Sequence, residues 1–350
     1  MELMHMKSLK KGIRITAIPL FYLRCTLFLI ILFLATACGE ELLPLDLLER
    51  TDCSPPALVS IRATGNKSIR LCFSEKVEAA SARVSVEGET AGSVTQEDDF
   101  SLVAHTSVPL IPGKQAWVSF VVEDISGNAL WARVPIWGFN AHAAHLLITE
   151  FTTKGTEKQP DRVELVVLKS GDLAGITLSS GLAGRWTDRC VLPPGNVDEG
   201  TFIVVFFQDG NAEDIPKNTL ICRSQELLGL PGSNGILVLT DSPSSDATII
   251  DCVLYASHTK TAHGFGTEEV WEQANLAIDR NAWKPVIPNT QEVDSSWAVD
   301  SAATTSTRSL CRRDTYKDTD TKNDWYVCAT KKASFGSYNS REEWEGNQER

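Results

Sequence analysis

The residue whose position most clearly offers chemistry is Cys38, which directly follows a segment built like an export signal. A basic stretch ends at Arg24, an apolar run occupies residues 25–34, and three small residues then lead to the cysteine. This order of basic region, apolar core and small residues is the pattern of a secretory signal peptide. The thirteen residues from 25 to 37 fall short of the roughly 20 that a membrane-spanning helix needs. We therefore predict a signal peptide over residues 1–37, cleaved between Ala37 and Cys38.

The sequence Leu-Ala-Thr-Ala-Cys at residues 34–38 resembles the lipobox of bacterial lipoproteins. The resemblance implies that the Cys38 thiol receives a diacylglyceryl group and that the new N-terminal amine is acylated. Leucine lies one place earlier than the family usually has it, and alanine takes its position. Several acyl chains hold a protein on a membrane better than one, because each buried CH₂ contributes about 0.8 kcal/mol. The alternative is an ordinary signal peptide followed by an unmodified cysteine.

The lipid anchor leads to an expected location. We expect the chain in the bacterial cell envelope, on the outer membrane rather than the inner one, and leave open whether it faces the periplasm or the surface. Apart from the covalent lipid, we expect no cofactor and no metal. Residues 1–37 hold five of the 33 basic side chains and one of the 45 acidic ones, so cleavage leaves 28 against 44 and a net charge of −16. Such a charge repels phosphate backbones, so we expect no nucleic-acid partner.

Seven cysteines remain after Cys25 leaves with the signal and Cys38 takes lipid. Disulfides suit an exported protein, but an odd number leaves at least one thiol free or paired between chains. Cys311 and Cys328 flank the last hairpin-like segment and are the first candidate pair; a bridge closing a loop of that size would contribute about 3 kcal/mol. Two weaker pairings remain open, 53 with 72 and 190 with 222. No C-x-x-C or paired Cys/His spacing occurs, which argues against a zinc site.

Short alternating segments after the tether of residues 38–54 predict β-strands that position these residues. In residues 55–140 the predicted strands are 59–63, 69–73, 83–86, 100–104, 116–122 and 129–136. Turn residues separate them, as in a β-sandwich. The motifs at 71–77, 110–113 and 122–130 resemble bacterial immunoglobulin-like domains of envelope and surface-layer proteins. In that family these motifs are structural, so they imply no catalytic residue.

A second block, residues 141–340, also reads as all-β and precedes a polar tail at 341–350. Its predicted strands are 146–151, 163–168, 201–206, 236–239 and 249–255. Eight motifs resemble the lamin-tail domain in the family's own order: 147–151, 162–166, 172–178, 192–195, 251–255, 309–313, 323–325 and 334–339. The family's usual tryptophan is replaced by Ile176, and residues 257–296 are an insertion. That insertion is interpreted either as a functional loop or as a segment packed on the sheet edge.

The fold class predicted is therefore all-β, with two tandem immunoglobulin-like sandwiches behind a lipoprotein signal. We expect a membrane-anchored, non-enzymatic binding or scaffold module for a protein or glycan partner. A surface-exposed adhesin is the alternative. A further alternative is an unrecognised hydrolase using acidic residues such as Glu150 and Glu164, predicted on neighbouring strands. The acidic run from Asp318 to Asp324 is either a solvated turn or a calcium loop; it lacks the glycine and terminal glutamate of an EF-hand.

Overall fold

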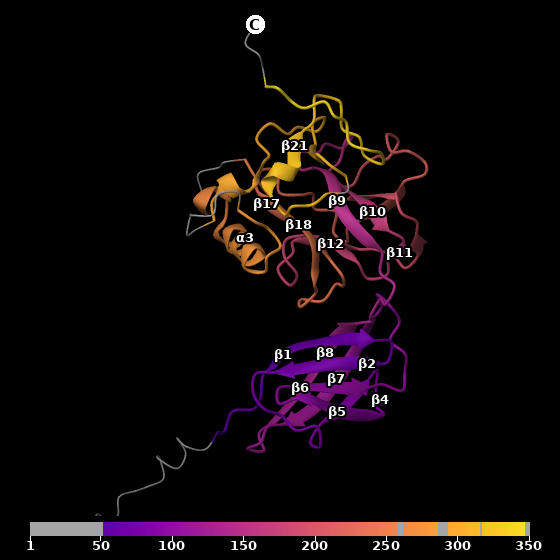
Figure 1. The fold of residues 1–350 in the computed structure, drawn as a ribbon, viewed down its shortest axis with the longest axis vertical. Coiled ribbons are helices and arrows are strands. Elements are labelled where there is room, and N and C mark those ends of the chain that lie inside the picture. Colours follow the sequence, from indigo (N-terminus) through magenta and orange to yellow (C-terminus); the bar gives the residue numbers. More distant parts are fainter. Residues whose placement is uncertain (1–51, 258–261, 286–292, 316, 347–350) are drawn as a thin grey trace, which may run out of the picture. The chain divides into compact units, whose positions relative to one another are not determined.

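The computed structural model describes residues 52–257, 262–285, 293–315 and 317–346 (Figure 1). The predicted signal peptide and Cys38 lie outside these residues. None of the described helices is long and apolar enough to cross a membrane. The described chain is built mainly from β-strands, which confirms the predicted all-β class.

Residues 58–137 form two four-stranded sheets. The first has the order β1-β2-β6-β5, and the second has the order β4-β3-β7-β8. Their strands are β1 (Leu58–Gly65), β2 (Ser68–Phe73), β3 (Arg83–Val86), β4 (Glu89–Thr90), β5 (Ser93–Asp98), β6 (Ser101–His105), β7 (Gln115–Glu123) and β8 (Ala129–Trp137).

Alternating side chains bury one face of each of these sheets. In β7 the side chains of Val118, Phe120 and Val122 are buried, and those between them point outward. They share one core with residues of the other sheet, including Ile69 and Leu71. This shared core makes the pair of sheets a sandwich, the first sandwich below. The six strands predicted here are confirmed within a residue or two, while β4 and β5 lack a clear apolar pattern and were not predicted.

Residues 145–327 form the second sandwich. One sheet has the order β16-β15-β10-β9-β20-β21, a second has β13-β12-β17-β18-β19, and β11 and β14 pair separately. The strands are β9 (His145–Thr152), β10 (Arg162–Lys169), β11 (Gly171–Asp172), β12 (Thr177–Ser180), β13 (Asp188–Val191), β14 (Asn196–Val197), β15 (Phe202–Phe206), β16 (Leu220–Arg223), β17 (Gly235–Thr240), β18 (Ile249–Ala256), β19 (Val299–Asp300), β20 (Leu310–Arg312) and β21 (Trp325–Val327). All five predicted strands are present.

The predicted insertion contains an α-helix, α3 (Glu268–Asp279), and short 3₁₀ helices at Ala262–Gly264 and Ser295–Trp297; a third lies at Lys322–Asp324. Thr267 caps α3 by accepting a hydrogen bond from the Val270 amide. Phe265 and Trp283, on either side of the helix, are buried in the core of the second sandwich. Figure 1 shows α3 in orange, and this helix contacts β17. The described part of the insertion therefore packs against the sheet, where α3 contacts the middle strand β17 and not an edge strand as the second interpretation supposed.

Candidate functional site

Two glutamates stand directly opposite each other on the antiparallel strands β9 and β10. Glu150 pairs with Glu164 in the register of these strands, as their predicted placement on neighbouring strands implied. Both side chains are 0% exposed. Two facing carboxylates away from water are unfavourable unless donors surround them or a proton is shared.

Hydrogen-bond donors surround the Glu150 carboxylate. The Ser309 hydroxyl donates to Oε1, and the Ser334 amide lies 3.0 Å from each carboxylate oxygen. The Ser334 hydroxyl donates to Oε2 at 2.9 Å. Burial raises the pKa of Glu150, and these donors act in the opposite direction.

Glu164 has a different set of partners. The Thr149 hydroxyl lies 2.5 Å from Oε1, and the Gly336 amide donates to Oε2 at 2.5 Å. Burial raises the pKa of Glu164 well above its usual range, and the nearby charge of Glu150 raises it further. A hydroxyl can also accept a hydrogen bond, so Thr149 suits a protonated Glu164, whereas the Ser334 amide suits an ionised Glu150. We assign the proton of the pair to Glu164.

Both glutamates hold the segment 334–339, which we call the closing segment. Its Asn339 side chain adds two hydrogen bonds, to the carbonyl oxygens of Thr149 at 2.9 Å and Arg312 at 2.8 Å. The carboxylate oxygens thus accept hydrogen bonds from neighbouring groups, and the chain covers both side chains. These hydrogen bonds hold the closing segment against the sheet, and a substrate has no access to either glutamate in this structure.

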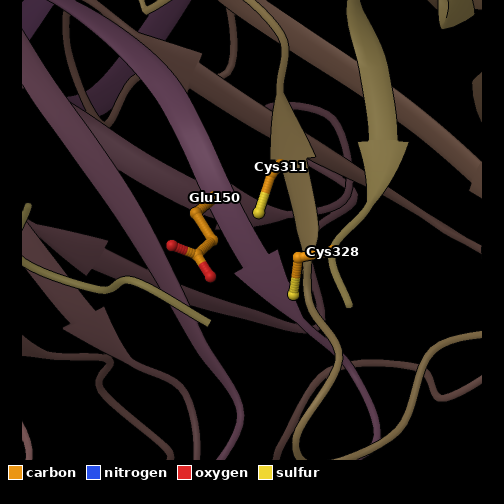
Figure 2. A group of neighbouring side chains, drawn as sticks. All are labelled: Glu150, Cys311 and Cys328. Atoms are coloured by element: carbon orange, nitrogen blue, oxygen red, sulfur yellow. The ribbon is translucent and has the colours of Figure 1, made fainter. Parts of the chain in front are cut away.

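Two cysteines lie beside Glu150, and Figure 2 shows the three side chains around one common region. The sulfur atoms of Cys311 and Cys328 and a Glu150 oxygen all lie within 4.8 Å of one another. The sequence predicted this pair of cysteines but gave no sign that Glu150 joins them. Both cysteines are free thiols here, so the predicted disulfide is not shown.

The two thiols differ in acidity. A hydrogen bond with Cys311 lowers the pKa of Cys328 to about 7, although burial opposes the change. Burial raises the pKa of Cys311 well above its usual range. Cys328 is therefore the sulfur that more readily carries negative charge.

A buried arginine joins the two sheets of the second sandwich. Arg312, 1% exposed, donates from Nε to the Ile148 carbonyl at 2.7 Å and contacts Asp251 at 3.1 Å. Burial lowers the pKa of Arg312, but the attraction of Asp251 and other carboxylates outweighs it and leaves a net rise. Burial raises the pKa of Asp251 to about 6, although Arg312 acts against this. Arg312 lies within the motif 309–313, whose residue pattern gave no sign of this role.

The acidic run at 318–324 is a turn bound by protein cations and amides. Asp318 accepts a hydrogen bond from Arg312 at 2.8 Å, and Lys284 lies 2.6 Å from Asp320. Asp324 accepts hydrogen bonds from the Thr319 amide and hydroxyl. The segment is therefore a turn held together by protein groups, with Asp324 buried within it.

Aromatic side chains gather on the outer face of the β7–β8 pair in the first sandwich. Trp131 is 69% exposed and Trp117 is 38% exposed. The Arg133 guanidinium lies 4.8 Å from the Trp117 ring centre. Val121 stands opposite Trp131, and Pro135 stands opposite Trp117. We call these five residues the tryptophan face. The two strands were predicted from the sequence, but the role of their outward side chains was not.

A family model described as TP_1001_2nd, "protein second domain", matches residues 144–219 and 224–327. The chain belongs to this family. The match covers the second sandwich except β16, and it includes the strands that carry Glu150, Glu164 and Cys311. An uncharacterized protein of Treponema pallidum (strain Nichols) is 24% identical over 234 residues, which cover 60% of this chain and 58% of that protein. The chain thus matches less than two thirds of this relative's length.

Several solved structures show some likeness to this chain. The tandem Ig repeats of Dlar match 56% of this chain and 96% of that one, with 15% identity and a TM-score of 0.21. The N-terminal part of the bacterial S-layer protein SbsC matches 42% of this chain and 44% of that one, with 15% identity and a TM-score of 0.23. Likeness at this level carries no inference about function.

Proposed function

We propose that the chain is a lipid-anchored protein of the bacterial cell envelope that binds a protein or glycan partner without catalysing a reaction. The anchor is Cys38, and the lipobox-like sequence at 34–38 supports it. Together, the anchor and the two β-sandwiches describe a binding module held at a membrane surface. The finer identity proposed for the second sandwich is a lamin-tail-like domain, supported by the order of its motifs and by Asn339, which bonds two neighbouring strands.

The tryptophan face is the observation that carries the binding role. Tryptophan and arginine are enriched among the residues that contribute most to protein–protein binding. On this face, Trp131 is largely exposed, and Trp117 is stacked beneath Arg133. The neighbouring Val121 and Pro135 add apolar surface to the face, a composition that favours a protein over a glycan. Burial of a large apolar side chain such as Trp131 contributes about 1.5–3 kcal/mol of favourable free energy. A partner that covers Trp131 would gain this contribution.

The open edge of the sheet is less suited to recognition than its face. β8 is an edge strand of nine residues, and Pro135 lies within it. Proline has no amide hydrogen, and in an edge strand it hinders the addition of another strand. We therefore assign recognition to the side chains of the tryptophan face.

Site-specific photocrosslinking tests this role. A photoreactive residue replaces Trp131 in one variant and Ile125 in another; Ile125 is 70% exposed in a turn of the same sandwich and serves as the matched control. We expect a discrete crosslinked product in intact cells from position 131 only, and Trp117→Ala should reduce its yield. Identical products from both positions, or none from position 131, would contradict the binding role. Glycosidase and protease digestion of the product distinguishes a glycan partner from a protein.

The proposed binding module is either a surface adhesin or a periplasmic protein, depending on which side of the outer membrane it faces. Protease treatment of intact cells removes both sandwiches if the chain is displayed at the surface, as an adhesin requires. Complete protection, with digestion only after the outer membrane is opened, would rule out the adhesin and leave a periplasmic binding module.

A further inference from the structure

Two thiols and a carboxylate, which are good metal ligands, converge under the closing segment beside a serine hydroxyl. They come from distant parts of the chain. Glu150 lies in β9 and Cys311 in β20. Ser309 directly precedes β20, and Cys328 directly follows β21. Cys311, Cys328 and Glu150 are each 0% exposed. Burial of two thiols against a carboxylate is costly when either sulfur is ionised, unless a cation balances the charge.

The spacing of these groups resembles a metal coordination shell. The Ser309 hydroxyl oxygen lies 3.2 Å from the Cys328 sulfur and 3.5 Å from the Cys311 sulfur, and it donates a hydrogen bond to Glu150. Zinc–sulfur bonds of about 2.3 Å and zinc–oxygen bonds of about 2.1 Å place neighbouring tetrahedral ligands roughly 3.5–3.8 Å apart. The ligand atoms of Glu150, Cys311 and Cys328, all within 4.8 Å of one another, therefore need to approach by at most about 1 Å to surround one ion.

The strand register favours a shared ion over a disulfide. Cys311 stands opposite Tyr326, and the Cys328 amide donates to the Ser309 carbonyl, so the two cysteines are diagonal neighbours. Diagonal positions on antiparallel strands are about 7–8 Å apart. Disulfides need Cα atoms about 4.4–6.8 Å apart, whereas two ligands of one metal tolerate the wider spacing.

Groups around the cluster already orient its ligands. The Ser334 amide and hydroxyl hold the Glu150 carboxylate, and the Ser309 amide donates to the Cys328 sulfur at 3.3 Å. Such outer contacts are a regular part of metal sites, because they fix the ligands and stabilise their charged forms.

We propose that Cys311, Cys328 and Glu150, with the Ser309 hydroxyl beside them, form a closed structural site for a divalent, thiolate-binding metal ion such as Zn²⁺. Both thiols lose their protons on binding, and the ion offsets two of the three negative charges that the two thiolates and the carboxylate then carry; the hydrogen bonds from Ser334 to Glu150 stabilise the remaining charge. The ion links β9, β20 and the end of β21, and through Ser334 it holds the closing segment. Because that segment covers the site, the ion binds as the segment docks, and metal binding contributes to folding.

Cobalt substitution of the full-length protein in detergent tests the site. The protein is reduced, stripped with a chelator and titrated with Co²⁺, whose bonds to thiolates give a charge-transfer absorption. We expect one Co²⁺ per chain, displaced by Zn²⁺, and loss of this absorption in Cys311→Ser and Cys328→Ser. Cys252→Ser is the matched control, because Cys252 is a buried cysteine of the same sandwich outside the cluster. Ser334→Ala should weaken binding by about 10–100-fold, as expected for a residue that orients a ligand.

Two further readouts keep the proposal falsifiable if a cysteine variant fails to fold. In the wild-type protein under partial denaturation, Zn²⁺ should slow alkylation of Cys311 and Cys328 but not of Cys53. The proposal is overturned if wild-type protein shows no thiolate–cobalt absorption, or if that absorption survives replacement of both cysteines. It is also overturned if peptide masses show Cys311 joined to Cys328 by a disulfide in protein taken from cells.

Discussion

Glu150 and Glu164 face each other across two antiparallel strands, and both are completely buried beneath residues 334–339. Their donors come from the closing segment and from the strands themselves. The two carboxyls therefore tie the end of the described chain to the central strands of the six-stranded sheet. In this structure the two glutamates hold the closing segment against the sheet.

The assigned proton predicts that Glu164→Gln is well tolerated. A glutamine can donate to the Thr149 hydroxyl and accept from the Gly336 amide, as a protonated Glu164 does. We expect its free energy of unfolding at pH 7 to stay within about 1 kcal/mol of wild type. Glu164→Ala leaves a cavity and an unpaired amide and should cost about 2–4 kcal/mol. Equal destabilisation of the two variants in denaturant titrations would contradict this protonation state.

Asn339 should anchor the closing segment. Asn339→Ala removes donors from two carbonyl oxygens, and we expect a loss of about 1–3 kcal/mol. Hydrogen exchange of the Gly336 amide should accelerate in this variant, because that amide is protected by the docked segment. Arg341→Ala, an exposed position two residues further on, is the control and should leave this exchange unchanged. Unaltered exchange in Asn339→Ala would show that the segment is held by other contacts.

Arg312 and Arg313 form a natural test of buried against exposed charge. Arg312→Lys keeps a positive charge but loses the planar set of donors that reaches Ile148 and Asp251. We expect a loss of about 3–5 kcal/mol, since the buried carboxylate then lacks matched partners. Arg313→Lys, whose ion pair with Glu343 is exposed, should change stability by less than about 1 kcal/mol. Thermal or chemical denaturation compares the two, and similar losses would refute the role given to Arg312.

Asp161 should make stability depend on pH. Burial raises the pKa of this carboxyl, although the Leu230 and Gly155 amides donate to it. Because the folded-state pKa lies above the unfolded value, the unfolded chain loses its proton first as pH rises. The contribution of Asp161 is therefore fully present below pH 3.8 and falls as pH rises through the folded-state pKa.

The variant Asp161→Asn isolates this effect, because asparagine does not titrate. Its stability relative to wild type should increase as pH rises from 3.8 through the folded-state pKa of Asp161. Denaturant titrations at several pH values measure this change. A relative stability that stays constant, or decreases, would show that the pKa of Asp161 is not raised.

Strand positions could be predicted from the sequence, because period-two alternation is a local signal. β7 shows this well: every second side chain from Ala116 to Val122 is apolar, and the strand lies where that pattern places it. The local capping signal of α3 was also present in Thr267 and the two glutamates after it, although the helix was not predicted.

The buried cluster depends on distant contacts and could not be predicted in the same way. Glu150 and Ser334 are separated by 184 residues, and Arg312 meets Asp251 across 61. No local period links such positions. Cys311 and Cys328 lie on either side of one hairpin. Their closeness could therefore be predicted from their spacing in the sequence.

Fatty-acid labelling in cells tests the lipid anchor at Cys38, on which the proposed function depends. Wild type, Cys38→Ala and Cys53→Ala are compared for incorporation of labelled palmitate and for partition into detergent; Cys53 is an exposed cysteine fifteen residues further along. We predict that wild type and Cys53→Ala incorporate label and enter the detergent phase, while Cys38→Ala does neither. Label and detergent partition that persist in Cys38→Ala would contradict the anchor and the function built on it.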